Sequence, residues 1–276
     1  MEFLGLDDLI KIALAEDIGH GDITTDNLVD GDQETTGIFL AKSPGILAGL
    51  KICQAVFKYL DPNIEFISYK QDGFLVAPGE NIAEVKGKTQ ILLTGERVSL
   101  NFLQRLSGIA TRTRQMADMI EGSGAQIVDT RKTTPGLRNL EKYAVSMGGG
   151  RNHRFGLYDG VMIKDNHIKA AGGISQAISR IRPRVPHTVK IEVEVETLEQ
   201  LQEALQVRAD IIMLDNMDVE TMKKAVAMVN GQALLEASGG INEATLVEVA
   251  RTGVDFISIG ALTHSVTSLD ISFNII

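Results

Sequence analysis

The chain has 276 residues, of which 44% are hydrophobic and 23% are charged, and its formal net charge is -9. This length suits one large α/β domain, or a main domain with a smaller one, and the composition is that of an ordinary globular protein. The negative charge argues against nucleic acid as the principal partner, and the lack of a long uncharged apolar run argues against a membrane span.

The N-terminal sequence MEFLGLDDLIKIALAEDIG carries acidic residues early and has no basic segment ahead of an apolar one. Its apolar residues recur at helical spacing between positions 6 and 15, so it predicts an amphipathic helix and not a signal peptide. Cys53 is the single cysteine, which excludes an intrachain disulfide and fits a reducing compartment. We therefore expect a cytoplasmic protein with no membrane and no nucleic acid among its partners.

Residues 16–26, EDIGHGDITTD, are interpreted as a loop, because two glycines lie among aspartates and threonines. Composition alone leaves two interpretations open. One is a capped turn in which Asp and Thr side chains bond to the local backbone, and the other is a loop near an active site.

Between residues 35 and 88, alternating apolar and polar residues predict short strands joined by Gly-containing turns. Apolar residues at helical spacing predict helices over 49–60 and 89–105. Arg97, on the second of these helices, is by default a surface charge. This portion of the chain predicts a small α+β domain.

Six short apolar runs follow residue 108, separated by helical segments: QIVD (126–129), VMI (161–163), VKIEVEV (189–195), DIIMLD (210–215), ALLEAS (233–238) and VDFISIG (254–260). The last four begin roughly 20 residues apart, which is the spacing of parallel βα units. An open doubly wound sheet and an α/β barrel both satisfy this pattern. Because a full eight-stranded barrel takes about 250 residues, a barrel here would have fewer strands or short helices.

Polar or glycine residues stand at the carboxyl end of each predicted strand: Arg131 and Lys132, Lys164, Glu194, Asp215, Ser238 and Gly239, and Gly260. Barrels and open α/β sheets build their sites at this end. Glycines on the last two strands predict a phosphate site, because glycine lets backbone N–H groups approach an anion. Glu194 and Asp215 could hold a divalent cation or ribose hydroxyls. Glu192, Glu194 and Glu196 share one face of a strand, so they must be solvated, paired or ligating.

A cationic stretch, residues 129–169, interrupts this acidic chain. It holds eight basic residues against four acidic ones, a local balance of +4, together with His153 and His167. Its charges alternate with Gly and Pro turn residues and the apolar run VMI, whereas a solvated helix face would show helical spacing. The stretch is therefore predicted to attract an anionic ligand.

Several motifs together resemble the quinolinate phosphoribosyltransferase family, whose members are also called carboxylating nicotinate-nucleotide pyrophosphorylases. They are DTRKTTPGLRNLEKYAVSMGGGRNHRFGLYDGVMIKDNH, KIEVEVE, IMLDNM, EASGG, SIGALTHS and, nearer the N-terminus, EDIGHGDITTD and GERVSLNFLQRLSGIAT. The resemblance covers nearly the whole chain, and its long central motif is undisrupted. It implies transfer of phosphoribosyl from phosphoribosyl pyrophosphate to quinolinate with Mg²⁺, which gives nicotinate mononucleotide, pyrophosphate and CO₂ in NAD biosynthesis.

The resemblance also implies the architecture. It predicts an N-terminal open α/β sandwich domain over residues 1–108 and a C-terminal α/β barrel with fewer than eight strands over residues 109–265. The tail, residues 266–276, would return to the first domain. A homodimer is implied, in which each barrel site is completed by the partner's N-terminal domain, and higher assembly is left open.

Site residues are carried over from the resemblance position by position. The clamp for the two quinolinate carboxylates is expected to comprise Arg131, His153, Arg154 and Lys164, with Arg97 reaching in from the neighbouring subunit. The phosphoribosyl pyrophosphate site is expected to comprise Lys132 on the pyrophosphate, Glu194 and Asp215 on the ribose hydroxyls or metal, Ser238, Gly239 and Gly260 on the 5′-phosphate, and His264 beside the phosphoribosyl group. Of these, the expected catalytic residues are Lys132, Glu194 and Asp215.

Three alternatives remain at this point. A molybdenum-transport-associated relative has the same fold and another substrate, but it is expected to diverge where His153, Arg154 and Lys164 stand intact here. A barrel aldolase would use Lys132 or Lys164 as a Schiff-base amine, which borohydride would trap with a carbonyl substrate. A catalytically silent anion-binding protein would bind phosphate-rich ligands and release no pyrophosphate.

Overall fold

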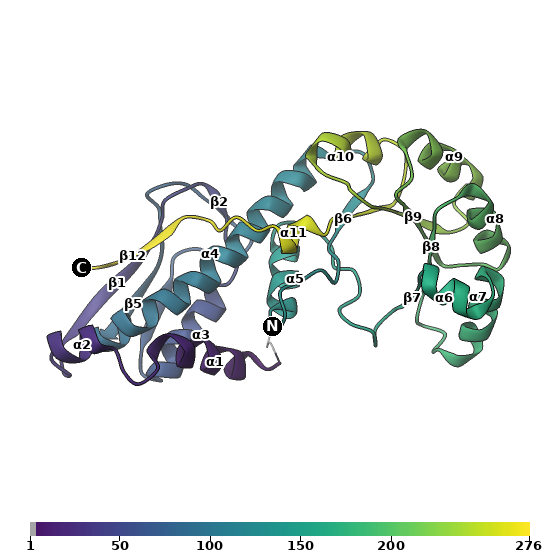
Figure 1. Ribbon diagram of the computed structural model, residues 1–276. Helices are drawn as coiled ribbons and strands as arrows, with labels where there is room; N and C mark the ends of the chain where they lie inside the picture. Colours follow the sequence, from purple (N-terminus) through teal and green to yellow (C-terminus); the bar gives the residue numbers. More distant parts are fainter. Residues whose placement is uncertain (1–3) are drawn as a thin grey trace. The chain divides into compact units, whose positions relative to one another are not determined.

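The computed structural model describes residues 4–276, so the first three residues of the predicted N-terminal segment lie outside the described residues (Figure 1). By its contacts the chain divides into two units. The first comprises the chain up to Arg114, Thr134–Gly149 and Ser265–Ile276, and the second comprises Gln115–Thr133 and Gly150–His264. The predicted boundary between residues 108 and 109 lies inside a continuous helix, Thr89–Met119, so the division differs from the predicted one in detail.

Within the described residues, the first unit contains a four-stranded antiparallel sheet in the order β12-β1-β5-β3. The elements of this unit are α1 (Leu6–Ile18), α2 (Ile23–Leu28), β1 (Glu34–Ala41), β2 (Gly45–Ile46), α3 (Leu50–Leu60), β3 (Glu65–Ser68), β4 (Leu75–Val76), β5 (Asn81–Lys88), α4 (Thr89–Met119, which ends in the second unit), α5 (Arg138–Met147) and β12 (Ile271–Ile275). Aromatic rings from three elements meet in its core: Phe39 lies with ring centroids 4.6 Å from Phe273 and 6.1 Å from Phe57. The C-terminal strand β12 thus packs in the first unit, where it pairs with β1.

Helix α4 is longer than predicted, because residues 106–119 continue the helix expected over 89–105. Gly108 lies inside it and permits a close approach within the first unit. A Cβ at this position would be 2.2 Å from the carbonyl oxygen of Thr267. The glycine therefore makes room for the C-terminal segment and does not end the helix.

The interpretation of residues 16–26 as a loop is wrong in part, because they contain the end of α1 and the start of α2. Asp22 caps α2: its Oδ1 accepts a hydrogen bond from the Thr25 backbone N–H at 3.0 Å, and its Oδ2 accepts one from the Thr94 hydroxyl at 3.2 Å. These contacts agree with the capped-turn interpretation and fix the segment within the first unit.

The second unit is built on a parallel sheet of six strands, counted over residues 4–276, in the order β6-β11-β10-β9-β8-β7. Its strands are β6 (Gln126–Val128), β7 (Val161–Ile163), β8 (Ile191–Val195), β9 (Ile211–Asp215), β10 (Leu234–Ser238) and β11 (Phe256–Ser258). Its other elements are α6 (Asp165–Ala171), α7 (Ile174–Ile181), the 3-10 turn η1 (Arg182–Arg184), α8 (Leu198–Gln206), α9 (Val219–Val229), α10 (Glu243–Ala250) and α11 (Ala261–His264). The predicted α/β barrel with fewer than eight strands is confirmed in this form.

Helices α8, α9 and α10 lie along the outer side of this curved sheet (Figure 1). The first two begin with side-chain caps, because Thr197 accepts from the Gln200 N–H and Asp218 accepts from the Thr221 N–H. Since all six strands run in the same direction, their carboxyl ends lie at one edge of the sheet. Within residues 4–276 no helix combines the length and the apolarity that crossing a bilayer requires.

Candidate active site

A cavity of about 780 Å³ lies at the carboxyl ends of the parallel strands, and every residue that lines it belongs to the second unit. The sequence-predicted site residues that line this cavity are Arg131, Lys132, His153, Arg154, Lys164, Glu194, Asp215, Ser238, Gly239, Gly260 and His264. They come from positions 131 to 264 of the chain and meet because parallel strands present their carboxyl ends together.

Arg97 is the predicted site residue that does not line this cavity. It lies on α4 in the first unit, its side chain is 58% exposed, and its guanidinium lies 3.9 Å from the Glu96 carboxylate. Its expected role depends on a neighbouring subunit and stays a prediction.

The cationic stretch 129–169 does not form one continuous site. Its middle part is helix α5 (Arg138–Met147), which belongs to the first unit. There the fully buried Glu141 accepts a hydrogen bond from Arg105 at 2.6 Å and one from the Thr134 N–H at 3.1 Å. The cations of the stretch that line the cavity of the second unit therefore come from its two ends.

A buried aspartate shapes the cationic end of the cavity. Asp129 is fully buried at the end of β6, where it accepts hydrogen bonds from the Asn152 side chain at 2.6 Å and from the His153 N–H at 2.9 Å. These bonds fix the segment that carries His153 and Arg154. Burial and the neighbouring charge of Arg131 lower the pKa of Arg154, so two guanidinium groups are held close enough to repel each other. An anionic ligand would relieve that repulsion.

Carboxylates line the adjoining strands β8 and β9. Glu194 accepts a hydrogen bond from the Lys164 ammonium at 2.5 Å, and Asp215 accepts one from the Asn216 side chain at 2.8 Å. Burial raises the pKa of Asp215, and the charge of Glu194 raises it further. Two carboxylates that repel each other offer oxygen donors to a hard cation, and they can equally accept hydrogen bonds from sugar hydroxyls.

Glycines bring the backbone of two loops close to their neighbours. Gly239 has φ 97°, and a Cβ there would lie 2.1 Å from Asn216 Oδ1. A Cβ on Gly260 would lie 2.9 Å from Lys132 Cδ. Gly239 therefore requires glycine, whereas a side chain at Gly260 would require Lys132 to move. Both glycines leave backbone N–H groups uncovered by a side chain of their own, as a phosphate site needs.

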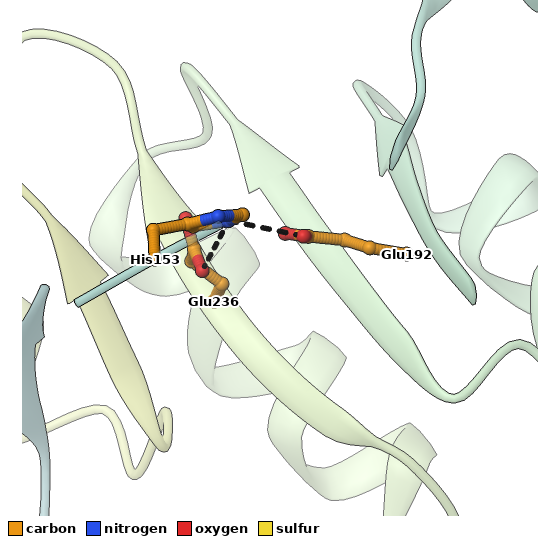
Figure 2. Close-up of side chains that lie close together, drawn as sticks. All are labelled: His153, Glu192 and Glu236. Carbon is orange, nitrogen blue, oxygen red and sulfur yellow. Dashed lines mark ion pairs between the residues drawn. The ribbon is translucent and has the colours of Figure 1, made fainter. Parts of the chain in front are cut away.

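Two residues near the cavity were not predicted as site residues. Glu236 lines the cavity, and Glu192, which does not line it, lies across β9 from Glu236, so that both carboxylates surround the imidazole of His153 (Figure 2). The signal was present: Glu236 and Ser238 are two positions apart on β10, as Glu192 and Glu194 are on β8, so each pair shares a face. Glu236 is less conspicuous in the sequence, because it lies within the mostly apolar run ALLEAS.

Models of known protein families match nearly the whole chain. Residues 22–107 match the N-terminal domain of quinolinate phosphoribosyl transferase, and residues 109–274 match the C-terminal domain of that enzyme. The chain is 50% identical over 275 residues to the probable nicotinate-nucleotide pyrophosphorylase (carboxylating) of Bacillus subtilis, and the alignment covers 100% of this chain and 95% of the relative. It is 46% identical over 286 residues to the carboxylating nicotinate-nucleotide pyrophosphorylase, chloroplastic, of Arabidopsis thaliana, covering 97% of this chain and 82% of that one.

Solved structures give the same result. NadC from Streptococcus pyogenes superposes with a TM-score of 0.95 at 41% identity, covering 99% of this chain and 97% of the other. The nicotinate-nucleotide pyrophosphorylase of Francisella tularensis also gives a TM-score of 0.95 at 41% identity, covering 98% of this chain and 96% of the other. Sequence and fold therefore point to one family over the full length of the chain.

Proposed function

The chain belongs to the quinolinate phosphoribosyltransferase family, and we infer that it transfers phosphoribosyl from phosphoribosyl pyrophosphate to quinolinate with loss of CO₂. The products are nicotinate mononucleotide and pyrophosphate. The observation that carries this inference is a single cavity lined by cations, carboxylates and glycine loops, which suit a dicarboxylate and a phosphorylated sugar together. The named relatives support this function and not the molybdenum-transport-associated alternative.

At the cationic end of the cavity, Arg131, Arg154 and Lys164 would bind the two carboxylates of quinolinate. A guanidinium offers parallel N–H donors that match a carboxylate, and each charge-assisted hydrogen bond contributes about 1.5–3 kcal/mol. His153 is proposed for the same end, since its imidazole lines the cavity beside Arg154. Arg97 of the partner subunit would complete the clamp.

Phosphoribosyl pyrophosphate would occupy the rest of the cavity. Lys132 would neutralise the pyrophosphate, and Glu194 and Asp215 would accept hydrogen bonds from the ribose hydroxyls. The residues proposed for the 5′-phosphate and the sugar beside it are Ser238, Gly239, Gly260 and His264. The 5′-phosphate assignment rests on the close approach of backbone that these glycines permit.

The chemistry requires little covalent help from the protein. The pyridine nitrogen of quinolinate already carries a lone pair, so attack on the anomeric carbon needs no general base. Substitution at an anomeric carbon passes through a cation-like transition state, which the negative charges of Glu194 and Asp215 would stabilise. Lys132 would stabilise the leaving pyrophosphate. Once the ring nitrogen is quaternary, its positive charge stabilises the electron pair that the breaking C–C bond leaves on the ring carbon. CO₂ then leaves without a Schiff base on any lysine, and the ring carbon takes up a proton from water.

We propose Mg²⁺ as the cofactor, and the donors present are of the right kind. Glu194 and Asp215 are carboxylates on neighbouring strands, and the pKa of Asp215 is raised by its burial and then by the charge of Glu194. A hard cation bound by such oxygens would relieve that repulsion. When bound, Mg²⁺ supplies positive charge to the departing pyrophosphate. The two carboxylates would hold it directly or through water.

We propose a homodimer with shared active sites, in which Arg97, a residue of the first unit, completes the clamp in the cavity of the partner subunit. A cytoplasmic location is proposed from the single cysteine, Cys53, which is buried and free.

The function is tested by incubating the protein with quinolinate, phosphoribosyl pyrophosphate and Mg²⁺ and following nicotinate mononucleotide by chromatography. Lys132→Ala is expected to reduce turnover by about 100-fold or more, because it removes the charge proposed for the leaving group. Lys169→Ala is the matched control, since this exposed lysine of the same stretch pairs with Asp165 at 3.0 Å and does not line the cavity. Folded wild-type protein that makes no nicotinate mononucleotide would contradict the proposal.

A further inference from the structure

A histidine and two buried glutamates form a cluster beside the cavity; His153 and Glu236 line the cavity, and Glu192 lies behind them. His153 Nε2 lies 3.0 Å from Glu192 Oε2 and 3.5 Å from Glu236 Oε2, as Figure 2 shows. The two glutamates are only 4% and 3% exposed. They come from β8 and β10, the strands on either side of β9, and the imidazole of His153 contacts both of them. The reaction described above uses neither glutamate.

Two carboxylates in this position are costly to the fold. Oε1 of Glu192 and Oε1 of Glu236 are buried and have no hydrogen-bond partner among the described residues. Burial of a carboxylate oxygen without a partner destabilises the folded state, and an apolar pair of similar size would serve packing better. A purely structural role therefore does not account for two such groups around one imidazole.

The hydrogen bonds of the imidazole define its orientation. The Arg154 backbone N–H donates to His153 Nδ1 at 2.7 Å, so Nδ1 is an acceptor and the ring proton is on Nε2, facing Glu192. Metal-binding histidines show the opposite arrangement, in which the second nitrogen donates to an acceptor and the first offers its lone pair to the ion. Although the three side chains are close enough to surround an ion, this tautomer favours a hydrogen-bonded cluster over a metal site.

The same contacts connect the glutamates to Arg154. His153 is held by the carboxylates at Nε2 and accepts from the Arg154 main chain at Nδ1. The Arg154 guanidinium in turn donates to the Gly160 carbonyl at 3.1 Å. Glu192 also supplies negative charge that opposes the repulsion between Arg154 and Arg131. A change at either glutamate would thus move or loosen the guanidinium.

We propose that Glu192 and Glu236 are positioning residues for the carboxylate-binding end of the cavity, and that they act through His153 on Arg154. This proposal rests on the proposed function, in which Arg154 binds a carboxylate of quinolinate. It assigns the two glutamates no contact with the substrate. It also assigns His153 a supporting role in the clamp, because both of its ring nitrogens are engaged by the protein itself.

The test compares Glu192→Gln and Glu236→Gln with the wild type in steady-state assays of both substrates at about pH 8, where Glu236, with a pKa of about 7, is ionised. Glutamine keeps the size of the side chain and removes the charge, and a neutral hydrogen bond is about half as strong as a charge-assisted one. We expect the KM for quinolinate to rise about tenfold while the KM for phosphoribosyl pyrophosphate stays within about twofold. Glu203→Gln is the matched control: this half-buried glutamate of the second unit accepts from the Ser175 N–H and hydroxyl, and it does not line the cavity.

A double-mutant cycle tests the route of the effect. If Glu236 acts through Arg154, Glu236→Gln combined with Arg154→Ala raises the quinolinate KM no further than Arg154→Ala alone. Additive effects, an equal rise in both KM values, or no change in either would overturn the proposal. A metal ion that copurifies with the wild type in a one-to-one ratio and is lost from Glu192→Gln would also overturn it.

The two glutamine variants are made separately, so that either one decides the question if the other does not fold. Wild-type turnover tests the function itself, whereas the ratio of variant to wild-type KM tests only the positioning role. Failure of one is therefore distinguishable from failure of the other.

Discussion

Replacing Arg154 with alanine tests the carboxylate-binding end of the cavity. Its guanidinium lines the cavity and donates to the Gly160 carbonyl at 3.1 Å, and a guanidinium has further N–H donors for a ligand. Loss of one charge-assisted hydrogen bond costs about 1.5–3 kcal/mol, which corresponds to a rise of about 10- to 150-fold in the quinolinate KM. The KM for phosphoribosyl pyrophosphate should change by less than about twofold, because its proposed contacts are on other strands.

The assay is steady-state turnover with one substrate varied at a time. Arg154→Lys is the matched variant, since it keeps the charge and loses the planar fork, and it should lie between the wild type and the alanine variant. Thermal unfolding gives an independent measure. Stabilisation by added quinolinate should shrink in Arg154→Ala, because the variant lacks a guanidinium that is proposed to bind this ligand. Equal rises in both KM values would refute the clamp assignment.

Three further changes have defined outcomes. Burial and then the charge of Glu192 raise the pKa of Glu236 to about 7, above its ordinary value of 4.5. Between these two pH values the folded state binds more protons than the unfolded state, so the free energy of unfolding of the wild type falls as the pH rises from 4.5 through 7. Glu236→Gln should therefore gain on the order of 2–3 kcal/mol relative to the wild type between about pH 4.5 and about pH 8 in urea unfolding, and a constant difference would contradict this. Gly239→Ala places a Cβ 2.1 Å from Asn216 Oδ1 and should raise the KM for phosphoribosyl pyrophosphate about tenfold. Gly240→Ala is the control, because Gly240 also has a positive φ but has open space around it, and this variant should leave that KM unchanged. Similar KM values for the two variants would contradict the steric explanation. Mixing Arg97→Ala subunits with Lys132→Ala subunits should restore about a quarter of wild-type activity, since half of the dimers then hold one intact site, and no recovery after proven subunit exchange would assign Arg97 to its own subunit.

The rim of the site could be predicted because strand ends are visible in the sequence. Each apolar run ends at a polar or glycine residue, and a parallel sheet brings these terminal residues together at one edge. The residues one layer deeper were harder to find. Glu236 lies inside an apolar run, and only its two-residue spacing from Ser238 indicates that it faces the same side.

Other parts of the fold depend on contacts that the local sequence does not specify. Helix α5 was not predicted, because it lies within a charged stretch and follows Pro135-Gly136, although its Leu140, Ala144 and Val145 are buried at helical spacing. The pairing of β12 with β1 joins segments more than 200 residues apart in the chain, and no local pattern encodes such a register. Gly108 lies inside α4 because a side chain there would clash with the carbonyl oxygen of Thr267, which is distant in the sequence. The need for glycine at this position therefore follows from tertiary packing.

The most direct test of the central claim is the stoichiometry of the reaction with quinolinate and, in parallel, with nicotinate. We expect one CO₂ and one pyrophosphate for each nicotinate mononucleotide formed from quinolinate. Nicotinate should give little product, because several cations line one end of the cavity, as two carboxylates require, and nicotinate has one carboxylate. Equal rates with both substrates, or nicotinate mononucleotide formed without CO₂, would contradict that claim.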